Sequence, residues 1–229
     1  MKVAIHQPNF LPWIGYFFKI SQCDIFVFLD DVQLAKGFTP RNRLKGPHGL
    51  FWLTVPLVGG IESRKLICDV EIAGFEQWRD VSIKTLGHCY KRAPAFDEVL
   101  EQVLTPFTNA AWTKLAEFNE ALIRQTLEYL NIRPTLVRSS DLNTTGQSTE
   151  RLISICKALG ADTYLSGFGG QSYQDSQLFH EAGIKLEIYD FKHPEYPQLW
   201  GDFEKNLSVV DLLFNCGKNS REIIDGSKV

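Results

Sequence analysis

Apolar positions along this chain fall into two alternating patterns. Short, nearly continuous apolar runs are typical of strands buried in a parallel sheet, whereas longer segments with apolar residues at every third or fourth position are typical of helices. The predicted strands span residues 3–6, 24–30, 51–57, 135–139, 162–166 and 184–191. The predicted helices span residues 13–21, 75–90, 109–130, 149–159 and 172–182, and Ser208 caps a last helix that ends at Gly217.

This alternation predicts the α/β class, with a mainly parallel, Rossmann-like sheet and helices on both of its faces. We expect a single domain over residues 1–229, because no linker rich in proline or serine divides the chain. Residues 75–130 are a candidate helical insertion into that domain. Residues 32–49, which are punctuated by glycine and proline, are predicted to form a long loop.

Charge and composition narrow the classes of function. The 24 Lys and Arg residues against 27 Asp and Glu give a net charge of −3, which disfavours a dedicated DNA-binding protein. The chain lacks an apolar run long enough to span a membrane. Its five cysteines include no C-x-x-C pair, so we expect reduced thiols, a cytoplasmic location and no metal site.

Candidate chemistry lies where the predicted strands end, because ligands of open α/β sheets bind beyond the carboxyl ends of the strands. His6, Gln7 and Asn9 follow the first strand, and Asp30 and Asp31 follow the second. His6 or either carboxylate is a candidate general base, and Gln7 and Asn9 are candidate substrate-binding residues. The alternative interpretation makes His6 a core histidine, Asp31 a cap of the next turn and Asp30 the partner of an arginine.

Three further segments are candidates for binding a substrate. Residues 36–45 hold four cations and no acid, which favours a phosphate-bearing ligand, although a solvated loop has the same pattern. The glycine-rich segment after the strand 162–166 can present backbone N–H groups to a phosphate or an oxyanion, or it can be a simple tight turn. His193 and Tyr196 follow the last strand as a candidate acid or base and a pocket residue. The candidate substrate-binding residues in the first two segments are Arg41, Arg43, Lys45, Ser166, Gly167, Gly169, Gly170 and Tyr173.

Several motifs together resemble the WbqC-like family. They are HQPNFLPWIGY at 6–16, LDDVQ at 29–33, WLTVP at 52–56, YLSG at 164–167 and LLFNCG at 212–217. The resemblance implies a bacterial protein of O-antigen, lipopolysaccharide or other surface-polysaccharide biosynthesis, in a family suggested to include glycine transferases. The first strand, His/Pro loop and helix are also similar to nucleotidyltransferase-like folds, but Gly15-Tyr16 stands where those folds carry Gly-His.

These observations lead to one functional hypothesis and two alternatives. The hypothesis is a transferase that moves an acyl group, with glycyl as the first candidate, onto the amine of a nucleotide-linked amino sugar. The predicted partners are therefore a sugar nucleotide and an acyl donor. Arg41, Arg43 and Lys45 would bind the diphosphate, residues 167–170 an oxyanion or phosphate, and His193 the leaving group. The alternatives are an ATP-dependent amide ligase that uses ATP and Mg²⁺ to form an acyl-adenylate, and a sugar-nucleotide-binding accessory protein without catalysis.

Overall fold

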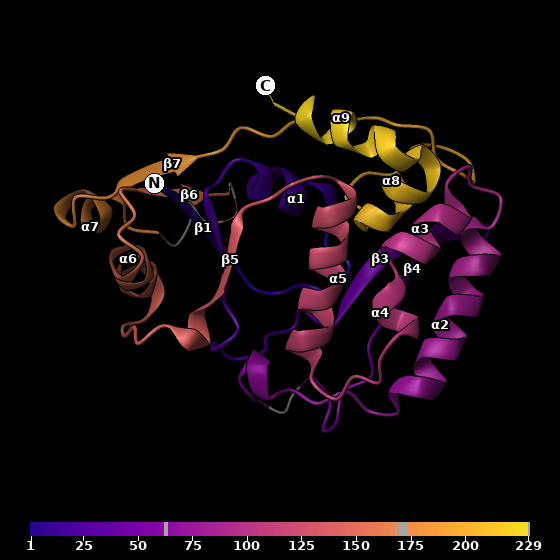
Figure 1. Cartoon of the computed structure of the whole chain (residues 1–229), viewed down its shortest axis with the longest axis horizontal. Coiled ribbons are helices and arrows are strands. Elements are labelled where there is room, and N and C mark those ends of the chain that lie inside the picture. Colours follow the sequence, from indigo (N-terminus) through magenta and orange to yellow (C-terminus); the bar gives the residue numbers. More distant parts are fainter. Residues whose placement is uncertain (62–63, 168, 170–173, 229) are drawn as a thin grey trace.

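A computed structural model describes residues 1–61, 64–167, 169 and 174–228. In these ranges, five parallel strands form the central sheet in the order β5–β2–β1–β6–β7 (Figure 1). The strands are β1 (Lys2–His6), β2 (Ile25–Phe28), β5 (Thr135–Arg138), β6 (Thr163–Ser166) and β7 (Lys185–Ile188). The parallel α/β prediction is therefore confirmed.

Alternate residues of the strands pack against helices on opposite faces, because successive side chains of a strand point to opposite sides. Ala4, Phe26 and Phe28 join the apolar cluster under α1 (Ile14–Ser21). Val3 and Val27 join a separate cluster under two other helices. These helices are α6 (Ser148–Ala158) and α7 (Ser176–Glu181). Figure 1 shows α6 and α7 on one side of the sheet and α1 on the other.

The order of the strands reverses beside β1. From β1 the chain adds β2 and then β5 in one direction, whereas β6 and β7 extend the sheet in the other direction. The crossovers on either side of this reversal run over opposite faces, which leaves a crevice at the carboxyl ends of β1 and β6. The fold therefore places a ligand-sized opening next to His6 and Ser166, the last residues of these two strands.

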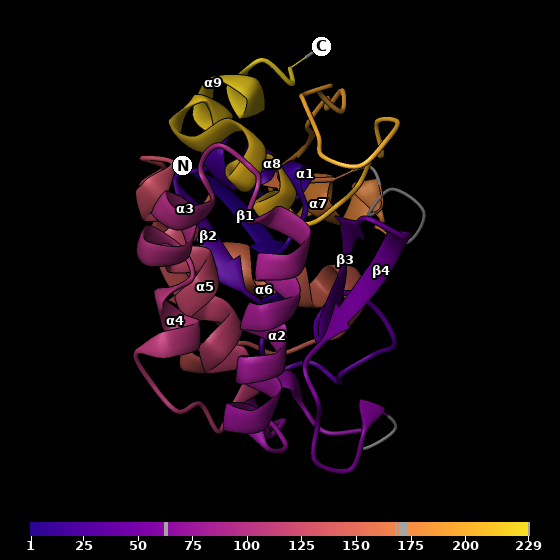
Figure 2. The same cartoon turned by 90° about the vertical axis from the view of Figure 1, so that its right-hand side faces the viewer.

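A hairpin replaces part of the predicted loop. The strands β3 (Arg41–Gly46) and β4 (Gly49–Thr54) pair antiparallel and lie outside the central sheet, beside α2 (Phe75–Tyr90) (Figure 2). The prediction of a loop over residues 32–49 was therefore wrong from Arg41 onward, and the predicted strand 51–57 starts earlier and ends at Thr54. The sequence did not predict β3, because its cations alternate with the buried residues Asn42 and Leu44 and leave no continuous apolar run.

Helices fill the segment between β4 and β5 and the end of the chain. The predicted helix 75–90 is confirmed as α2, but the predicted helix 109–130 begins only at Leu115. Just before Leu115, the Thr113 carbonyl accepts from the Ile72 N–H. The backbone there pairs with the segment before α2 and is not part of the helix. The other helices are α3 (Phe96–Gln102), α4 (Thr105–Thr108), α5 (Leu115–Tyr129), α8 (Val209–Cys216) and α9 (Ser220–Asp225), and short 3₁₀ turns cover Ile67–Asp69, Ser139–Asp141 and Gly217–Asn219.

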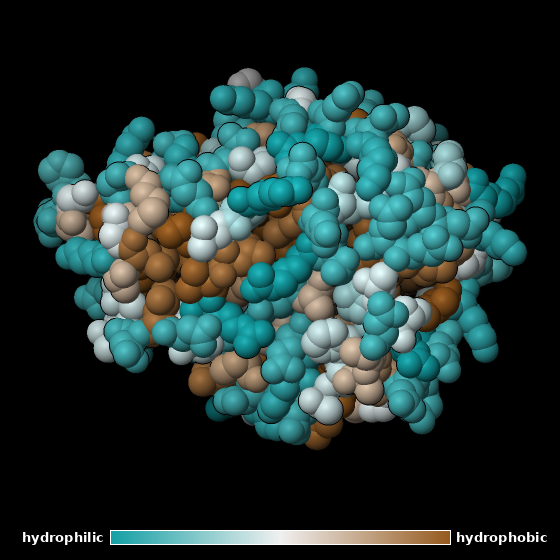
Figure 3. All heavy atoms as spheres, in the orientation of Figure 1, coloured by the Kyte–Doolittle hydropathy of each residue, from teal (hydrophilic) through white to brown (hydrophobic). Residues whose placement is uncertain are grey.

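The face of the molecule that is turned to the viewer in Figure 1 is mostly polar, and its apolar side chains gather around the edge strand β5 (Figure 3). Inside, the helices from α2 to α5 share one apolar cluster with α1 and β2, which contains Phe17, Phe26 and Phe118. In the ranges described above, no helix has the length and apolar character to cross a membrane.

Candidate functional site

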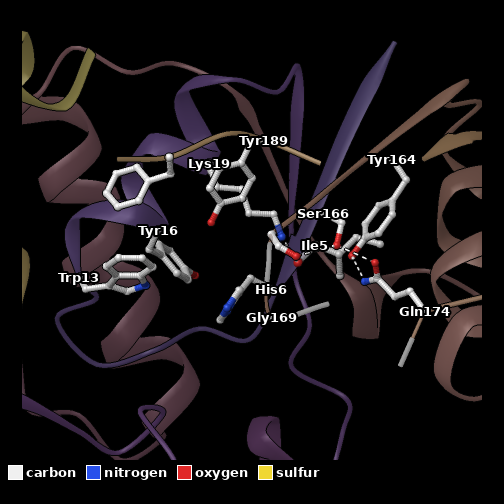
Figure 4. A pocket seen from close by; sticks show the side chains of 12 residues that line it. Ile5, His6, Trp13, Tyr16, Lys19, Tyr164, Ser166, Gly169, Gln174 and Tyr189 are labelled. Carbon is white, nitrogen blue, oxygen red and sulfur yellow. Dashed lines mark hydrogen bonds between the residues drawn. The ribbon is translucent and has the colours of Figure 1, made fainter. Parts of the chain in front are cut away.

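A cavity of about 380 Å³ opens at the carboxyl ends of β1 and β6, where the strand order reverses. Figure 4 shows side chains from α1, from both strand ends and from the segment after β7 around it. The side chains that the argument uses are His6, Trp13, Tyr16, Lys19, Ser166, Gln174 and Tyr189. Two of them, His6 and Lys19, carry nitrogen atoms suited to proton transfer and to anion binding.

His6 is a neutral imidazole with one nitrogen available. Burial and, to a smaller extent, the nearby charge of Lys19 together lower the pKa of His6 to about 4, against an opposing effect of the Gln7 carbonyl. The Nδ1 atom lies 3.1 Å from that carbonyl oxygen, which can only accept, so Nδ1 carries the hydrogen. In the described part of the chain no group is hydrogen bonded to Nε2. Its lone pair is therefore free to take a proton.

Lys19 places a buried ammonium group in the same cavity. Its side chain is 4% exposed, and Nζ donates to the Ile5 carbonyl at 2.8 Å. Burial lowers the pKa of Lys19 to about 8, so the amine is mostly protonated at neutral pH. An ammonium group has three hydrogens to donate, and the structure assigns one of them a partner. Lys19 is therefore suited to bind a phosphate or a carboxylate.

Hydroxyl and amide groups complete the wall. The Tyr16 hydroxyl donates to the Gln7 carbonyl at 3.0 Å, and Ser166 Oγ donates to Gln174 Oε1 at 2.6 Å. Burial raises the pKa of Tyr189 to about 12, so its phenol stays protonated. Gly167 packs closely against this ring, because a Cβ there would lie 3.0 Å from the Tyr189 hydroxyl oxygen and the ring would have to shift.

Trp13 forms the side of the cavity next to α1. A Cβ on Gly15 would lie 2.4 Å from the Trp13 indole, so the ring can occupy this position only over a glycine. The indole packs edge-on against Phe191 with ring centres 5.2 Å apart. Trp13 and Gly15 in the sequence WIG thus shape the cavity wall together.

The segment after β1, residues 7–12, is fixed by side chains from distant parts of the chain. Asn119 on α5 donates to the Pro8 carbonyl at 2.8 Å, and Asn42 on β3 donates to the Leu11 carbonyl at 2.7 Å. The Ser208 hydroxyl donates to the same Leu11 carbonyl at 2.8 Å. These contacts fix the position of His6 relative to the start of α1.

Gln7 and Asn9, two predicted binding residues, take part in this arrangement. The Thr39 hydroxyl lies 3.0 Å from Gln7 Oε1 and 3.2 Å from Asn9 Oδ1. Gln7 also lines a second cavity on the other side of His6, whereas Asn9 is buried.

Asp30 and Asp31 lie at the end of β2 and are held by the segment after β5. Asp30 is 2% exposed and accepts from the Ser139 hydroxyl and from the N–H and hydroxyl of Ser140. The Ser139 hydroxyl oxygen also lies 2.5 Å from Asp31 Oδ1, so its one hydrogen is shared between the two carboxylates. Asp31 in addition forms an ion pair with Arg151 on α6. The structure thus gives each carboxylate partners within the protein and does not bring either one into the cavity with Lys19.

The predicted phosphate-binding cations share one face of β3 but have different partners. The Arg41 guanidinium stacks over Trp52 at 4.4 Å, and Arg43 donates to the Asn206 carbonyl at 3.4 Å. Lys45 is buried and donates to Gln198 Oε1 at 3.1 Å and to the Asp202 carbonyl. None of these three side chains lines the cavity that contains Lys19.

Tyr196 and His193 do not line the cavity that contains Lys19. The Tyr196 hydroxyl donates at 2.9 Å to Asp211, a carboxylate without solvent exposure that also accepts from Tyr90 at 2.9 Å. His193 Nδ1 lies 2.8 Å from the Pro194 carbonyl, and its Nε2 accepts from the Asn206 N–H at 3.0 Å. With both nitrogens engaged, His193 supports the wall by stacking on Trp13 at 6.4 Å.

The glycine-rich segment is described in part. Ser166, Gly167 and Gly169 line the cavity as expected for a strand end, whereas Gly170 and Tyr173 lie outside the described residues. Sequence reasoning did not select Lys19, Gln174 or Tyr189. Lys19 had a signal, because it is the one charged residue in the apolar segment 14–21 and follows Tyr16 by three positions, on the same helix face.

Within the part of the chain that the structure describes, no cluster of three or more His, Cys, Asp or Glu side chains is placed to hold a metal ion. The cavity instead offers one neutral base, one buried cation and several hydroxyl groups. This set suits the binding of an anionic substrate and the removal of a proton from it.

Comparisons with known proteins cover almost the whole chain. The model of the WbqC-like protein family matches residues 7–223. The uncharacterised protein Rv1507c of Mycobacterium tuberculosis is 34% identical over 225 residues, which cover 97% of each chain. No solved structure matches this chain. The matched residues include every described residue of the cavity except Ile5 and His6. The protein therefore belongs to the WbqC-like family.

Proposed function

We propose that this protein is a transferase that moves an acyl group, with glycyl as the first candidate, onto the amino group of a nucleotide-linked amino sugar. The observation that carries the proposal is the neutral His6 Nε2 beside the buried Lys19 ammonium in one cavity. The resemblance to proteins of surface-polysaccharide biosynthesis supports an amino sugar as the acceptor.

The proposed step begins with attack of the acceptor amine on the carbonyl carbon of an activated acyl donor, such as an acyl ester or an acyl-adenylate. A C–N bond forms and the carbonyl oxygen becomes an oxyanion. His6 Nε2 takes the proton that the amine nitrogen loses. As the bond from the carbonyl carbon to the leaving group breaks, the imidazolium returns this proton to the leaving group.

Lys19 is the proposed ligand for the phosphate of the sugar nucleotide. Among the described residues that line the cavity it is the cation, and a buried ammonium attracts an anion more strongly than an exposed one because little water screens it. Arg41, Arg43 and Lys45, which the sequence predicts as ligands of the diphosphate, do not line this cavity. The proposal therefore gives the phosphate to Lys19.

Mass spectrometry tests the proposal directly. A nucleotide-linked amino sugar is incubated with the protein and either glycyl-tRNA or glycine with ATP. We expect the acceptor to gain one glycyl residue and His6→Ala to lower the rate by about 100-fold or more. His48→Ala, in the exposed turn of the hairpin, is the matched control.

Three outcomes bear on the proposal. Absence of a mass gain with both donors would refute glycyl transfer. Release of AMP and pyrophosphate that requires both substrates would identify the adenylate route. If His6→Ala retains ligand affinity and also retains pathway function in cells, the protein acts as a binding protein rather than as an enzyme that uses His6.

A further inference from the structure

His6 borders a second cavity, of about 330 Å³, in addition to the one that contains Lys19. The two cavities share four residues: Ile5, His6, Tyr164 and Gln174. We call them the α1-side cavity and the α6-side cavity, after the helix that contributes to each. The candidate base therefore lies between the two cavities and lines both of them.

The two cavities lie over opposite faces of the sheet. Trp13, Tyr16 and Lys19 of the α1-side cavity come from α1 and the turn before it. Arg151 and Leu152 of the α6-side cavity come from α6, which packs on the other face. A ligand in one cavity would therefore approach His6 from the side opposite to a ligand in the other.

Gln174 helps to divide the two openings. Its Oε1 accepts from the Ser166 hydroxyl at 2.6 Å, and its Nε2 donates to the Tyr164 hydroxyl at 3.3 Å. With both ends of the amide engaged, the side chain is held in place. Figure 4 shows these two hydrogen bonds of Gln174, to Ser166 and to Tyr164.

The two cavities also differ in charge. The α1-side cavity contains the Lys19 ammonium, for which the structure gives no carboxylate partner among the described residues. In the α6-side cavity the cation is Arg151, and its charge is balanced by the ion pair with Asp31. The rest of that lining is apolar at Leu29 and Val32, with Gln7 and Ser148 as uncharged polar groups.

We infer that the α6-side cavity is a second substrate site, which takes the uncharged and partly apolar arm of the acyl donor. The anionic acceptor occupies the α1-side cavity, and the two reacting groups meet at His6. Apolar walls with a few amide and hydroxyl groups suit an amide-bearing chain or a nucleoside, which offer the same mixture of surfaces. The assignment of donor and acceptor rests on the proposed function; the presence of two independent binding sites does not.

The test uses binding measurements on the full chain with three probes. Inorganic pyrophosphate probes the α1-side cavity, whereas pantetheine and adenosine probe the α6-side cavity and distinguish an amide-bearing arm from a nucleoside. Val32→Phe fills the α6-side cavity, and Lys19→Gln removes the cation of the other. Val81→Phe, at a position 64% exposed on α2, is the matched control for the added ring.

We expect Lys19→Gln to weaken pyrophosphate binding about tenfold or more and to leave the uncharged probe unaffected. Val32→Phe should weaken binding of the uncharged probe and leave pyrophosphate binding unaffected. Saturating pyrophosphate should change the Kd of the uncharged probe by less than about threefold. Ser148→Gln at the mouth of the same cavity replaces Val32→Phe if that variant does not fold.

Two results would overturn the inference. One is displacement of the uncharged probe by pyrophosphate, which means that a single ligand spans both cavities. The other is failure of both uncharged probes to bind the wild-type protein. Independent binding without acyl transfer would refute only the proposed reaction, and acyl transfer with mutually exclusive probes would refute only the two-site inference.

Discussion

Replacement of Lys19 by Met should stabilise the protein while it removes anion binding. Met has a similar length and no charge, so the change removes the ammonium group and retains most of the packing. A fall in the pKa of Lys19 from 10.5 to about 8 corresponds to about 3 kcal/mol of cost for keeping the charged form buried at neutral pH. Loss of the hydrogen bond to the Ile5 carbonyl costs about 1 kcal/mol. The net gain for Lys19→Met at pH 7 is therefore about 2 kcal/mol.

The gain should depend on pH with a defined sign. The pKa of Lys19 is lower in the folded protein than in the unfolded chain, so between pH 8 and 10.5 the unfolded chain holds a proton that the folded protein has lost. The stability of the wild type then rises with pH relative to Lys19→Met. Near pH 10.5 the variant should have lost its advantage, because the buried amine is neutral.

Urea unfolding at pH 7 and pH 10, followed by tryptophan fluorescence, measures both quantities. Lys84→Met, on the exposed side of α2, is the control and should change the free energy of unfolding by less than about 0.5 kcal/mol. A variant less stable than the wild type at pH 7, or a difference that does not change with pH, would refute the reasoning. In that case the ammonium group is a structural anchor rather than a group retained for binding.

Three other predictions concern the site and its support. Because the pKa of His6 is lowered to about 4, a transfer rate that uses it as a base should stay level from pH 7 to pH 5 and fall only near pH 4; a fall that begins near pH 6.5 would contradict this. Gly15→Ala should cost about 1–3 kcal/mol of stability, since its Cβ would overlap the neighbouring indole ring, whereas Gly87→Ala, with space for a Cβ in α2, should gain about 0.5–1 kcal/mol in the same thermal melts. Tyr90→Phe should cost about 1–3 kcal/mol in urea, because Asp211 loses a hydroxyl donor in the interior, and pyrophosphate binding should be unchanged.

The strand-end residues of the site were predictable from sequence because a parallel sheet obeys a simple rule. Once the strands 3–6 and 162–166 are recognised, their carboxyl ends must face the same edge, and His6, Ser166 and Gly167 are placed there. The pairing of β1 with β6, which brings the two ends together, is a tertiary feature that the chain order does not state.

The partners of the charged residues were not predictable in this way. Lys19 lies in an apolar helix pattern, and only the packing of α1 on the sheet directs its ammonium group into the cavity. Asp31 pairs with Arg151, 120 positions away, and Lys45 reaches the Asp202 carbonyl across 157 positions. Local charge counting therefore identified a cationic segment but not its partners, because these are set by the distant chain that packs on β3.

The contacts that fix residues 7–12, directly after β1, make the site dependent on late steps of folding. Residues 7–12 are held by Asn42, by Asn119 and by Ser208, so their final geometry closes loops of about 30, 110 and 200 residues. Contacts between residues so far apart in the chain form late, since the entropy of loop closure is lost before they contribute. During refolding, recovery of activity should therefore lag behind recovery of secondary structure, and a ribosome-bound chain that has not yet exposed Ser208 should carry an assembled β1–β2 pair without a working site.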